Sequence, residues 1–450
     1  MKVAIVGAGA TGLAAAYDLA GAGQEVVVYE AGSEVGGLAA GFKAPAWQWT
    51  LEKFYHHWFY TDRDVLALID ELGHSDKVRF YNPVTSIWHE SGIYPLDAPV
   101  SKSATLSRVM NVFRLPGLSL FAKLRFGLVG AFLKIYPYGL SLEKYTADSW
   151  LSCWVGREAH ELIWRPLLIG KFGPLYDRVN MAWMWARAYK RTAQLGTYVG
   201  GFQAMLEDLA EAVRERGADI YLSTPVQRID RAAAGGLEVR IGDRIERYDQ
   251  VLFTAGPGLL LRVVPNLSEA YAEKVGALES LGAVALILAL DRQLMTDGTY
   301  WLNLPARSPD KNDNPFPFLA LVEHTNYVSA EYFGSDHIVY LGDYLPHEHE
   351  YFRLSEEELV ERFLPSLKKI NRDFSPGWIR RHWLFRVPYA QPVPFVNHSR
   401  NIPDIRTPIG GLYFASMSQV YPWDRGTNYA VELGRRTARL MLSDASQPLG

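Results

Sequence analysis

Three glycines near the amino terminus form a pattern typical of phosphate binding. Gly7, Gly9 and Gly12 give G-x-G-x-x-G between an expected strand at 3–6 and an expected helix at 11–22. The first glycine of this pattern allows a tight turn, the second lets a pyrophosphate approach the backbone, and the third lets the helix pack on the sheet. Free N–H groups at the helix start would then face the phosphates. The pattern predicts a dinucleotide site.

An acidic residue follows at the distance that such a site requires. Glu30 ends the next expected strand, 25–29, and lies 18 residues after Gly12. An acid about 20 residues beyond the last glycine binds a ribose hydroxyl in dinucleotide-binding folds. The order strand, helix, strand predicts a βαβ unit in a parallel sheet. A glycine turn in another kind of α/β protein is the alternative, and it leaves the position of Glu30 unexplained.

The run 30–37, Glu-Ala-Gly-Ser-Glu-Val-Gly-Gly, resembles the FAD-binding amine-oxidase-like superfamily. That superfamily includes monoamine and polyamine oxidases, protoporphyrinogen oxidase, phytoene desaturases and, more distantly, UDP-galactopyranose mutase. The resemblance implies that Gly36 and Gly37 lie close to the diphosphate and ribityl chain of FAD. An arginine commonly follows the glycine pair, and Leu38 stands there in this chain.

Later segments carry the same resemblance. Residues 410–416 are similar to the closing strand of the FAD domain, with Ser-Met at 416–417 in place of the usual Gly-Asp or Gly-Glu. Residues 426–430 resemble the helix start beneath the flavin, whose N–H groups would stabilise negative charge on reduced flavin. An ordinary surface helix capped by Thr427 is the alternative there. Residues 200–226 resemble the stretch that brings Val226 beside the adenine, and 253–256 resemble the strand that returns to the dinucleotide fold.

Pattern and resemblance together give one set of expected FAD contacts. These are Gly7, Gly9, Ala10, Thr11, Gly12, Glu30, Ala31, Gly36, Gly37, Leu38, Val226, Thr254, Gly256, Ser416, Met417, Gly426, Thr427, Asn428 and Tyr429.

The elements that must position these residues are interleaved along the chain. The expected fold class is α/β, with a Rossmann-like FAD-binding domain built from discontinuous segments, a mixed-sheet substrate domain and a helical insert. We expect the FAD-binding domain at 1–80, 196–262 and 395–450, the substrate domain at 81–100 and 263–394, and the insert at 101–195. Within these parts the pattern predicts helices over 141–155 and 157–168 and a strand over 226–229.

Two segments are similar to the bacterial protoporphyrinogen-oxidase-like branch, namely 52–59 with its following helix at 65–72, and 421–428. The resemblance implies that both border the reacting face of the flavin. In an extended segment His56 and His57 point in opposite directions, and we expect His56 toward the flavin. His382, Arg386, Tyr389 and Gln391 run along one expected strand before Pro392, and we expect them to line the same cavity. The expected substrate contacts are Tyr55, His56, His324, Arg386, Tyr389, Tyr421 and Trp423.

Composition narrows the classes of function. Lysine plus arginine number 46 against 49 acidic residues, so the chain lacks the basic excess expected of a nucleic-acid binder. The single cysteine indicates a reducing compartment, so we expect a cytoplasmic location. Aromatic residues make up 13% of the chain, which suits a pocket for a bulky or apolar small molecule. The stretch Pro346–Glu350 has metal-donor residue types but is typical of a solvated loop, so no metal site is expected.

A membrane contact stays open at this point. No run approaches the ~18 apolar residues of a spanning helix. The segment 116–136 is rich in Leu and Phe and carries Lys123, Arg125 and Lys134. A buried or amphipathic helix is the favoured interpretation, and a peripheral contact with a membrane surface is the alternative.

The leading hypothesis for function is an FAD-dependent oxidoreductase that abstracts a hydride from a CH–NH or CH–CH unit. No lysine aligns with the one that amine oxidases usually place near the flavin, which disfavours amine oxidation and leaves desaturation open. A non-redox flavin-dependent nucleotide-sugar mutase and a non-enzymatic binding protein on the same fold are the alternatives. The sequence assigns no catalytic residue and no oligomeric state.

Overall fold

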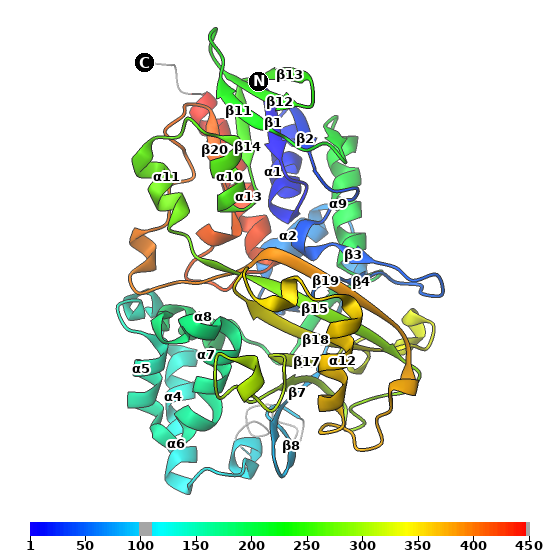
Figure 1. The fold of residues 1–450 in the computed structure, drawn as a ribbon. Helices are drawn as coiled ribbons and strands as arrows, with labels where there is room; N and C mark the ends of the chain where they lie inside the picture. The colour runs from blue at the N-terminus through cyan, green and yellow to red at the C-terminus, as the bar shows by residue number, and fades with distance from the viewer. Residues whose placement is uncertain (99–109, 447–450) are drawn as a thin grey trace.

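A parallel sheet with its helices and a larger mixed sheet lie one above the other, and a group of helices packs beside the mixed sheet (Figure 1). The computed structural model describes residues 1–98 and 110–446. The first residues of the expected insert, 101–109, and the last four residues of the chain lie outside the described residues. This organisation confirms the expected α/β fold class, while the exact domain boundaries stay predictions.

The parallel sheet has five strands in the order β10-β2-β1-β14-β20. The middle strand, with the sequence Lys-Val-Ala-Ile-Val, is apolar on both faces because helices cover one face, and a three-stranded antiparallel sheet with two helices covers the other. Strand β1 pairs with β2 on one side and with β14 on the other. The carboxyl end of β1 is therefore a topological switch point, and ligands bind at such points in parallel sheets. The strands are β1 (Lys2–Val6), β2 (Glu25–Tyr29), β10 (Asp219–Tyr221), β14 (Gln250–Phe253) and β20 (Leu412–Phe414).

Helices α1 and α13 pack against each other on one face of this sheet. α1 is rich in alanine, which allows the close approach, and Gly434 on α13 meets the backbone of Thr11. A Cβ atom added at Gly434 would lie 2.2 Å from the Thr11 carbonyl oxygen, so this crossing requires glycine. The helices here are α1 (Ala10–Gly21), α2 (Arg63–Glu71), α9 (Phe202–Glu215) and α13 (Thr427–Ala445). The opposite face carries α10 (Pro257–Val263), α11 (Glu269–Gly276), β11 (Arg228–Arg231), β12 (Leu237–Ile241) and β13 (Arg244–Tyr248).

The second large sheet has seven strands in the order β19-β15-β18-β17-β16-β7-β8. β16 and β7 are parallel and the other neighbours are antiparallel, as a mixed sheet requires. Alternate residues of β15 face α12 (Glu356–Leu367), and the others face the rest of the molecule. The strands are β7 (Val84–His89), β8 (Gly92–Pro95), β15 (Ser280–Leu290), β16 (Thr299–Asn303), β17 (Ala320–Glu323), β18 (His337–Leu345) and β19 (Ile379–Pro392).

Short strands connect the two large sheets. One pair is antiparallel, and three further strands form a small sheet in the order β5-β9-β6. Their bounds are β3 (Gly41–Phe42), β4 (Leu51–Glu52), β5 (Trp58–Phe59), β6 (Val78–Tyr81) and β9 (Leu195–Tyr198).

The insert is helical, but its helices begin later and break more often than the sequence indicates. The expected helix over 141–155 starts only at Ala147, because the Thr146 hydroxyl accepts a hydrogen bond from the Ser149 N–H and caps it. The expected helix over 157–168 is divided by a π-helical turn, His160–Trp164. The helices are α4 (Leu120–Ile135), α5 (Ala147–Val155), α6 (Arg157–Ala159), α7 (Arg165–Phe172) and α8 (Met181–Lys190).

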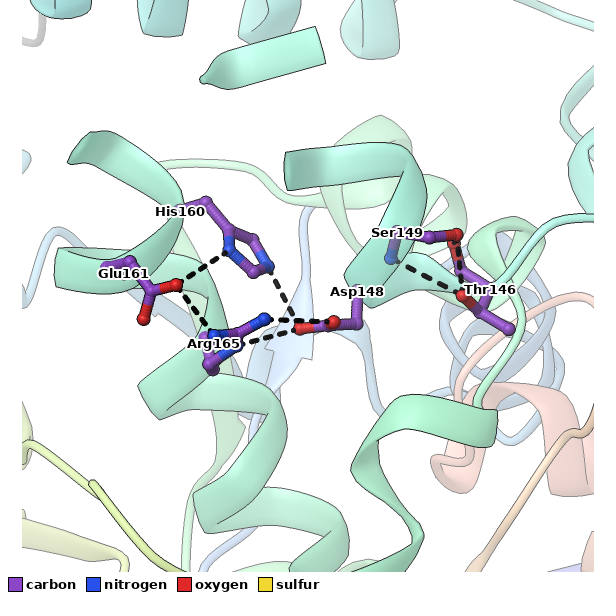
Figure 2. A network of polar contacts seen from close by, with 6 residues as sticks. All are labelled: Thr146, Asp148, Ser149, His160, Glu161 and Arg165. Atoms are coloured by element: carbon purple, nitrogen blue, oxygen red, sulfur yellow. Dashed lines mark hydrogen bonds and ion pairs between the residues drawn. The ribbon is translucent and has the colours of Figure 1, made fainter. Parts of the chain in front are cut away.

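A polar network at the π-helical turn holds α7 against α5 (Figure 2). Asp148 lies 2.9 Å from Nε2 of the fully buried His160, and Arg165 donates to both oxygens of Asp148 at 3.2 and 3.3 Å. Arg165 also donates to Glu161 at 2.6 Å. Figure 2 shows Ser149 turned toward Thr146 and away from His160, so these residues do not form a nucleophilic triad. The network fixes the start of α7.

The crossing of α1 and α13 is testable. We expect Gly434→Ala to lower the free energy of unfolding by about 1–3 kcal/mol, because the added carbon overlaps the Thr11 carbonyl. Gly130→Ala in the exposed part of α4 is the matched control, since its added Cβ meets nothing within 4 Å. We expect that control to be neutral or to gain up to about 1 kcal/mol. Urea unfolding measures both, and equal midpoints for the two variants would contradict the crossing.

Candidate dinucleotide and substrate site

The carboxyl ends of β1, β2 and β14 meet at the glycine loop. The Gly7 N–H donates to the Tyr29 carbonyl at 2.8 Å, and the Thr254 hydroxyl donates to the Val6 carbonyl at 2.8 Å. The Gly36 N–H donates to the Ala8 carbonyl at 2.9 Å, and Gly36 forms a bridge with Gly9. The structure therefore brings the first loop, the glycine pair and Thr254 into contact.

The three loop glycines are required for different reasons. A Cβ atom at Gly12 would lie 1.9 Å from the Gly7 carbonyl oxygen, and one at Gly7 would lie 2.5 Å from the Thr254 hydroxyl. At Gly9 the nearest atom to an added Cβ is the Gly36 carbonyl oxygen at 4.0 Å, which is ordinary contact. The protein itself leaves room for a side chain at Gly9, so no contact within the protein requires glycine there. This is the fit expected for a diphosphate.

Both helices that pack at Gly434 begin without a side-chain cap. Gly9 precedes α1, and its first free amides are those of Ala10, Thr11 and Gly12. Gly426 precedes α13, and a Cβ atom there would meet nothing within 4 Å. The structure thus presents two unsatisfied helix N-termini, each of which favours an anion.

The side chains at the start of α13 bind elsewhere and leave its amides available. The Thr427 hydroxyl accepts from the Trp58 indole N–H at 2.6 Å. The Asn428 side-chain oxygen accepts from the N–H groups of Asp64 and Val65 at 2.9 and 3.1 Å, which caps α2. The alternative of a surface helix capped by Thr427 is wrong, because Thr427 is buried and its side chain contacts Trp58.

Glu30 stands at the glycine loop, as expected, and its carboxylate binds backbone in this structure. One oxygen accepts from the Ala8 N–H at 2.8 Å and the other from the Gly32 N–H at 2.7 Å. The next residue, Ala31, is exposed, and Leu38 is half-buried beside the glycine pair. Glu30 therefore anchors the loop, and its contact with a ribose hydroxyl stays a prediction.

The expected strand over 226–229 begins instead at Arg228. Ser223 and Thr224 donate their N–H groups to the carbonyls of Gly32 and Glu30, so the chain crosses the end of β2 before it pairs again. Val226 lies in this crossing, and its contact with adenine stays a prediction.

Tyr389 joins the mixed sheet to the far end of the dinucleotide sheet. Its hydroxyl lies 2.8 Å from the Ser418 hydroxyl and accepts from the Ser418 N–H at 3.0 Å. Its ring lies 3.1 Å from where a Cβ atom of Gly256 would stand. Ser416 is buried and Met417 is half-buried in the same turn. Tyr389, expected to contact substrate, thus lies among residues expected to contact the cofactor.

The two adjacent histidines point to different parts of the molecule. The His56 ring packs against Phe202 at 5.6 Å, at the start of α9, whereas the His57 ring faces Tyr300 of the mixed sheet. Burial lowers the pKa of His56 to about 4 and that of His57 to about 3, so both rings are neutral at pH 7. Tyr55 packs edge-on against Trp301. The predicted alternation is confirmed, and which histidine faces the flavin stays a prediction.

Two expected substrate residues lie away from this site. His324 is buried among the rings of Tyr327, Phe333 and Tyr340, where burial lowers its pKa to about 3, so it is a core histidine. Arg386 donates to the carbonyls of Tyr351 and Leu354, which precede α12.

The strand register explains the position of Arg386. His382 on the same face of β19 contacts Glu356 of α12 at 2.6 Å, whereas Tyr389 points to the other face. The sequence expectation that His382 and Arg386 share a cavity with Tyr389 is therefore wrong.

A cavity of about 840 Å³ lies beside the start of α13. Tyr421, Trp423, Asn428 and Tyr429 line it from the carboxyl-terminal segment, and residues of α2, α4 and α8 line the rest. The rings of Trp423 and Tyr429 stack with centroids 6.0 Å apart and planes 8° apart. The structure thus assembles four of the expected site residues around one hollow.

A group of charged residues that the sequence did not indicate lies next to Trp423. We call Lys171, Arg187, Asp424 and Arg425 the Lys171 cluster. Asp424 accepts from the Trp183 indole N–H at 3.1 Å and from Arg187, while Lys171 lies 3.8 Å away. Arg425 donates to Gln391 of β19 and Tyr344 of β18. The cluster joins the insert, the mixed sheet and the segment before α13.

The sequence held only a weak signal for the Lys171 cluster. Lys171 lies just beyond the helix expected over 157–168, as a charged residue in the apolar run at the end of α7. Its partner Asp424 is more than 200 residues away in the chain, so no local spacing connects the two. Gln391 is the one contact of this cluster that the sequence indicated as a cavity-lining residue, and Arg425 donates to it.

Residues 1–98 and 110–446 contain neither a metal-binding group of side chains nor a membrane-spanning helix. No group of three or more His, Cys, Asp or Glu side chains is placed to hold a metal ion. None of the helices there has both the length and the apolar run that a bilayer crossing requires.

Comparison with known proteins identifies the family. The profile of the family described as flavin containing amine oxidoreductase matches residues 10–442. A 15-cis-phytoene desaturase of Synechococcus elongatus is 21% identical over 474 residues, covering 98% of this chain and 96% of the relative.

Two solved structures share the fold. One, from Exiguobacterium sp. 255-15 and provisionally named a protoporphyrinogen oxidase, has a TM-score of 0.75 at 20% identity and covers 98% of this chain and 99% of its own. Reduced UDP-galactopyranose mutase has a TM-score of 0.73 at 16% identity, covering 99% and 96% of the two chains. The glycine cradle, the two uncapped helix starts and the family profile agree that the cofactor is FAD. The chain belongs to the flavin containing amine oxidoreductase family and is an FAD-dependent oxidoreductase.

Proposed function

We propose that this enzyme removes a hydride from a CH–CH or CH–NH unit of a bulky small molecule held beside the start of α13. The observation that carries the proposal is the double role of residues 421–429. Residues from both ends of this segment line the 840 Å³ cavity, Asp424 and Arg425 within it belong to the Lys171 cluster, and its last residues provide the free amides of α13. Bound FAD supplies the hydride acceptor.

The chain's own groups suit this reaction. The free amides at the start of α13 stabilise negative charge next to them. His56 and His57 are neutral at pH 7, and burial raises the pKa of Tyr55 well above its ordinary value, so none of the three adds charge. The phytoene desaturase among the relatives supports the CH–CH form of the reaction.

We also propose that the exposed face of α4 rests on the surface of a cytoplasmic membrane. Phe121, Leu124, Leu128, Phe132 and Ile135 recur at helical spacing and are 40–76% exposed. Lys123 and Arg125 on the same helix favour anionic headgroups.

The cavity supports the same placement. Ile135, the last residue of α4, lines the 840 Å³ cavity together with Trp423 and Tyr429. An apolar substrate could therefore pass from the lipid toward the start of α13 without crossing bulk water.

The reaction type is tested by anaerobic mixing of the FAD-loaded protein with amines, porphyrinogens, carotenoid precursors and nucleotide sugars. We expect one class with a CH–CH or CH–NH unit to bleach the oxidised flavin without an external reductant. A nucleotide-sugar mutase would show no such bleaching and would need prior reduction. Failure of every class to bleach the flavin would count against the proposed reaction.

The dinucleotide site is tested by Gly9→Val. We expect this variant to fold but to purify without FAD, because the protein leaves room at Gly9 and the diphosphate would fill that room. Flavin absorbance and circular dichroism measure retention and folding separately. A folded, fully yellow Gly9→Val protein would show that the diphosphate lies elsewhere.

The membrane contact is tested by Leu128→Glu in sedimentation with vesicles of phosphatidylcholine and phosphatidylglycerol. We expect about tenfold weaker partitioning, because the substitution removes an exposed leucine that would enter the lipid and adds a negative charge. Ile245→Glu is the control, because Ile245 is also exposed but belongs to β13, which lies at the opposite end of the molecule from α4 (Figure 1). Equal sedimentation of both variants and the wild type would rule out the contact through α4.

A further inference from the structure

The Lys171 cluster holds more positive than negative charge. Lys171, Arg187 and Arg425 face a single carboxylate, Asp424, which is the only acidic side chain within 4.0 Å of them among the described residues. Arg187 is about one third exposed, but the side chains of Lys171 and Arg425 are 10% and 20% exposed. Buried cations without partners are costly, so a site of this kind favours an anionic ligand.

Lys171 is the most weakly paired member of the cluster. The two Asp424 oxygens already accept from Trp183 and Arg187, and Lys171 Nζ stands 3.8 Å from the nearer one, beyond hydrogen-bond distance. Among the described residues this is the only ion pair that Lys171 forms, and the residue is 92% buried. Its three N–H donors are therefore available to a ligand.

Aromatic rings form the walls around the ammonium group. Lys171 Nζ lies 5.5 Å from the ring centre of Trp183 and 5.1 Å from that of Tyr344. The Arg425 guanidinium lies 4.8 Å from the same Tyr344 ring. Tyr344 thus has two cations near it, and Arg425 directly precedes Gly426, where α13 begins.

We propose that Lys171, together with Arg425, binds an anionic oxygen of the substrate, a carboxylate or a phosphate, at the end of the site next to α13. The inference rests on the proposed function and narrows its substrate class, because a pure hydrocarbon would leave the Lys171 ammonium with only its 3.8 Å ion pair to Asp424. Asp424 and Arg187 hold Trp183 and Lys171 in place. Burial lowers the pKa of Lys171 well below its ordinary value. A bound anion would raise that pKa again, because it stabilises the charged ammonium.

The test uses the FAD-loaded enzyme and three aromatic probes of similar shape, namely benzoate, phenyl phosphate and neutral benzamide. Changes in the flavin absorption bands report binding. We expect benzoate or phenyl phosphate to bind at least about tenfold more tightly than benzamide, because the anion gains a charge-assisted hydrogen bond that a neutral amide lacks. The stronger of the two anions identifies the carboxylate or the phosphate as the preferred group. Equal binding of all three probes would overturn the proposal.

The variant Lys171→Met tests the assigned residue. We expect it to weaken the anionic probe about tenfold and to leave benzamide unchanged. Lys144→Met, an exposed lysine of the insert, makes the same change in net charge and should leave every probe unchanged. Unchanged anion binding in Lys171→Met would overturn the assignment. If that variant does not fold, the wild-type comparison of benzoate with benzamide still decides.

Two outcomes distinguish a failure of the anion-binding proposal from a failure of the proposed function. If the wild type binds no anion and Lys171→Met instead lowers the flavin reduction potential, the cluster serves the negative charge of reduced flavin and the proposal is wrong. If the protein holds no FAD, the proposed function fails. Anion binding to the FAD-free protein can then still be measured by titration calorimetry.

Discussion

The contact between Gly434 and Thr11 is the constraint on which the site depends. An α-helix carries free amides only in its first turn, so a site that uses two helix starts needs those starts close together. The absence of a side chain at Gly434 lets α13 lie directly on the first turn of α1. The alanines of α1 keep the rest of that interface thin. A larger residue at this crossing would separate the amides expected to face the diphosphate from those expected to face the flavin.

The segment before α13 shows how one stretch of chain serves two halves of a site. Thr427 and Asn428 direct their side chains to Trp58 and to the start of α2, so the backbone amides stay available. Trp423 and Asp424 point the other way, toward the insert. Residues 423–428 contact both large domains and the insert. A small movement of the insert would therefore displace the start of α13. The polar network at His160 limits such movement by fixing α7, which carries Lys171.

The lower part of the site combines apolar and charged features. The α4 face and the rings near Trp423 suit a bulky apolar body, whereas the Lys171 cluster suits an anionic group. These two features are compatible in one amphiphilic molecule whose apolar part lies toward α4 and whose anionic part lies toward Arg425. His56 and His57 are neutral at pH 7 and add no positive charge to this region.

Much of the fold followed from local pattern. The apolar run of β1, the glycine loop and Glu30 specify a βαβ unit because turn geometry and helix packing at those positions depend on residues within one short segment. The start of α13 at Gly426 was likewise readable in sequence. The expectations for His324 and Arg386 were wrong because strand register and ring packing, which involve distant residues, decide where those side chains point.

By itself, then, the sequence determined the cofactor loop, the α/β class and the family, since each rests on short-range spacing. Only the tertiary structure decided which charges meet. Arg187 and Asp424 are 237 residues apart in the chain, and their contact exists because the insert folds back against the segment before α13. Electrostatic interaction depends on distance in space, and spacing along the chain carries no information about that distance for segments so far apart.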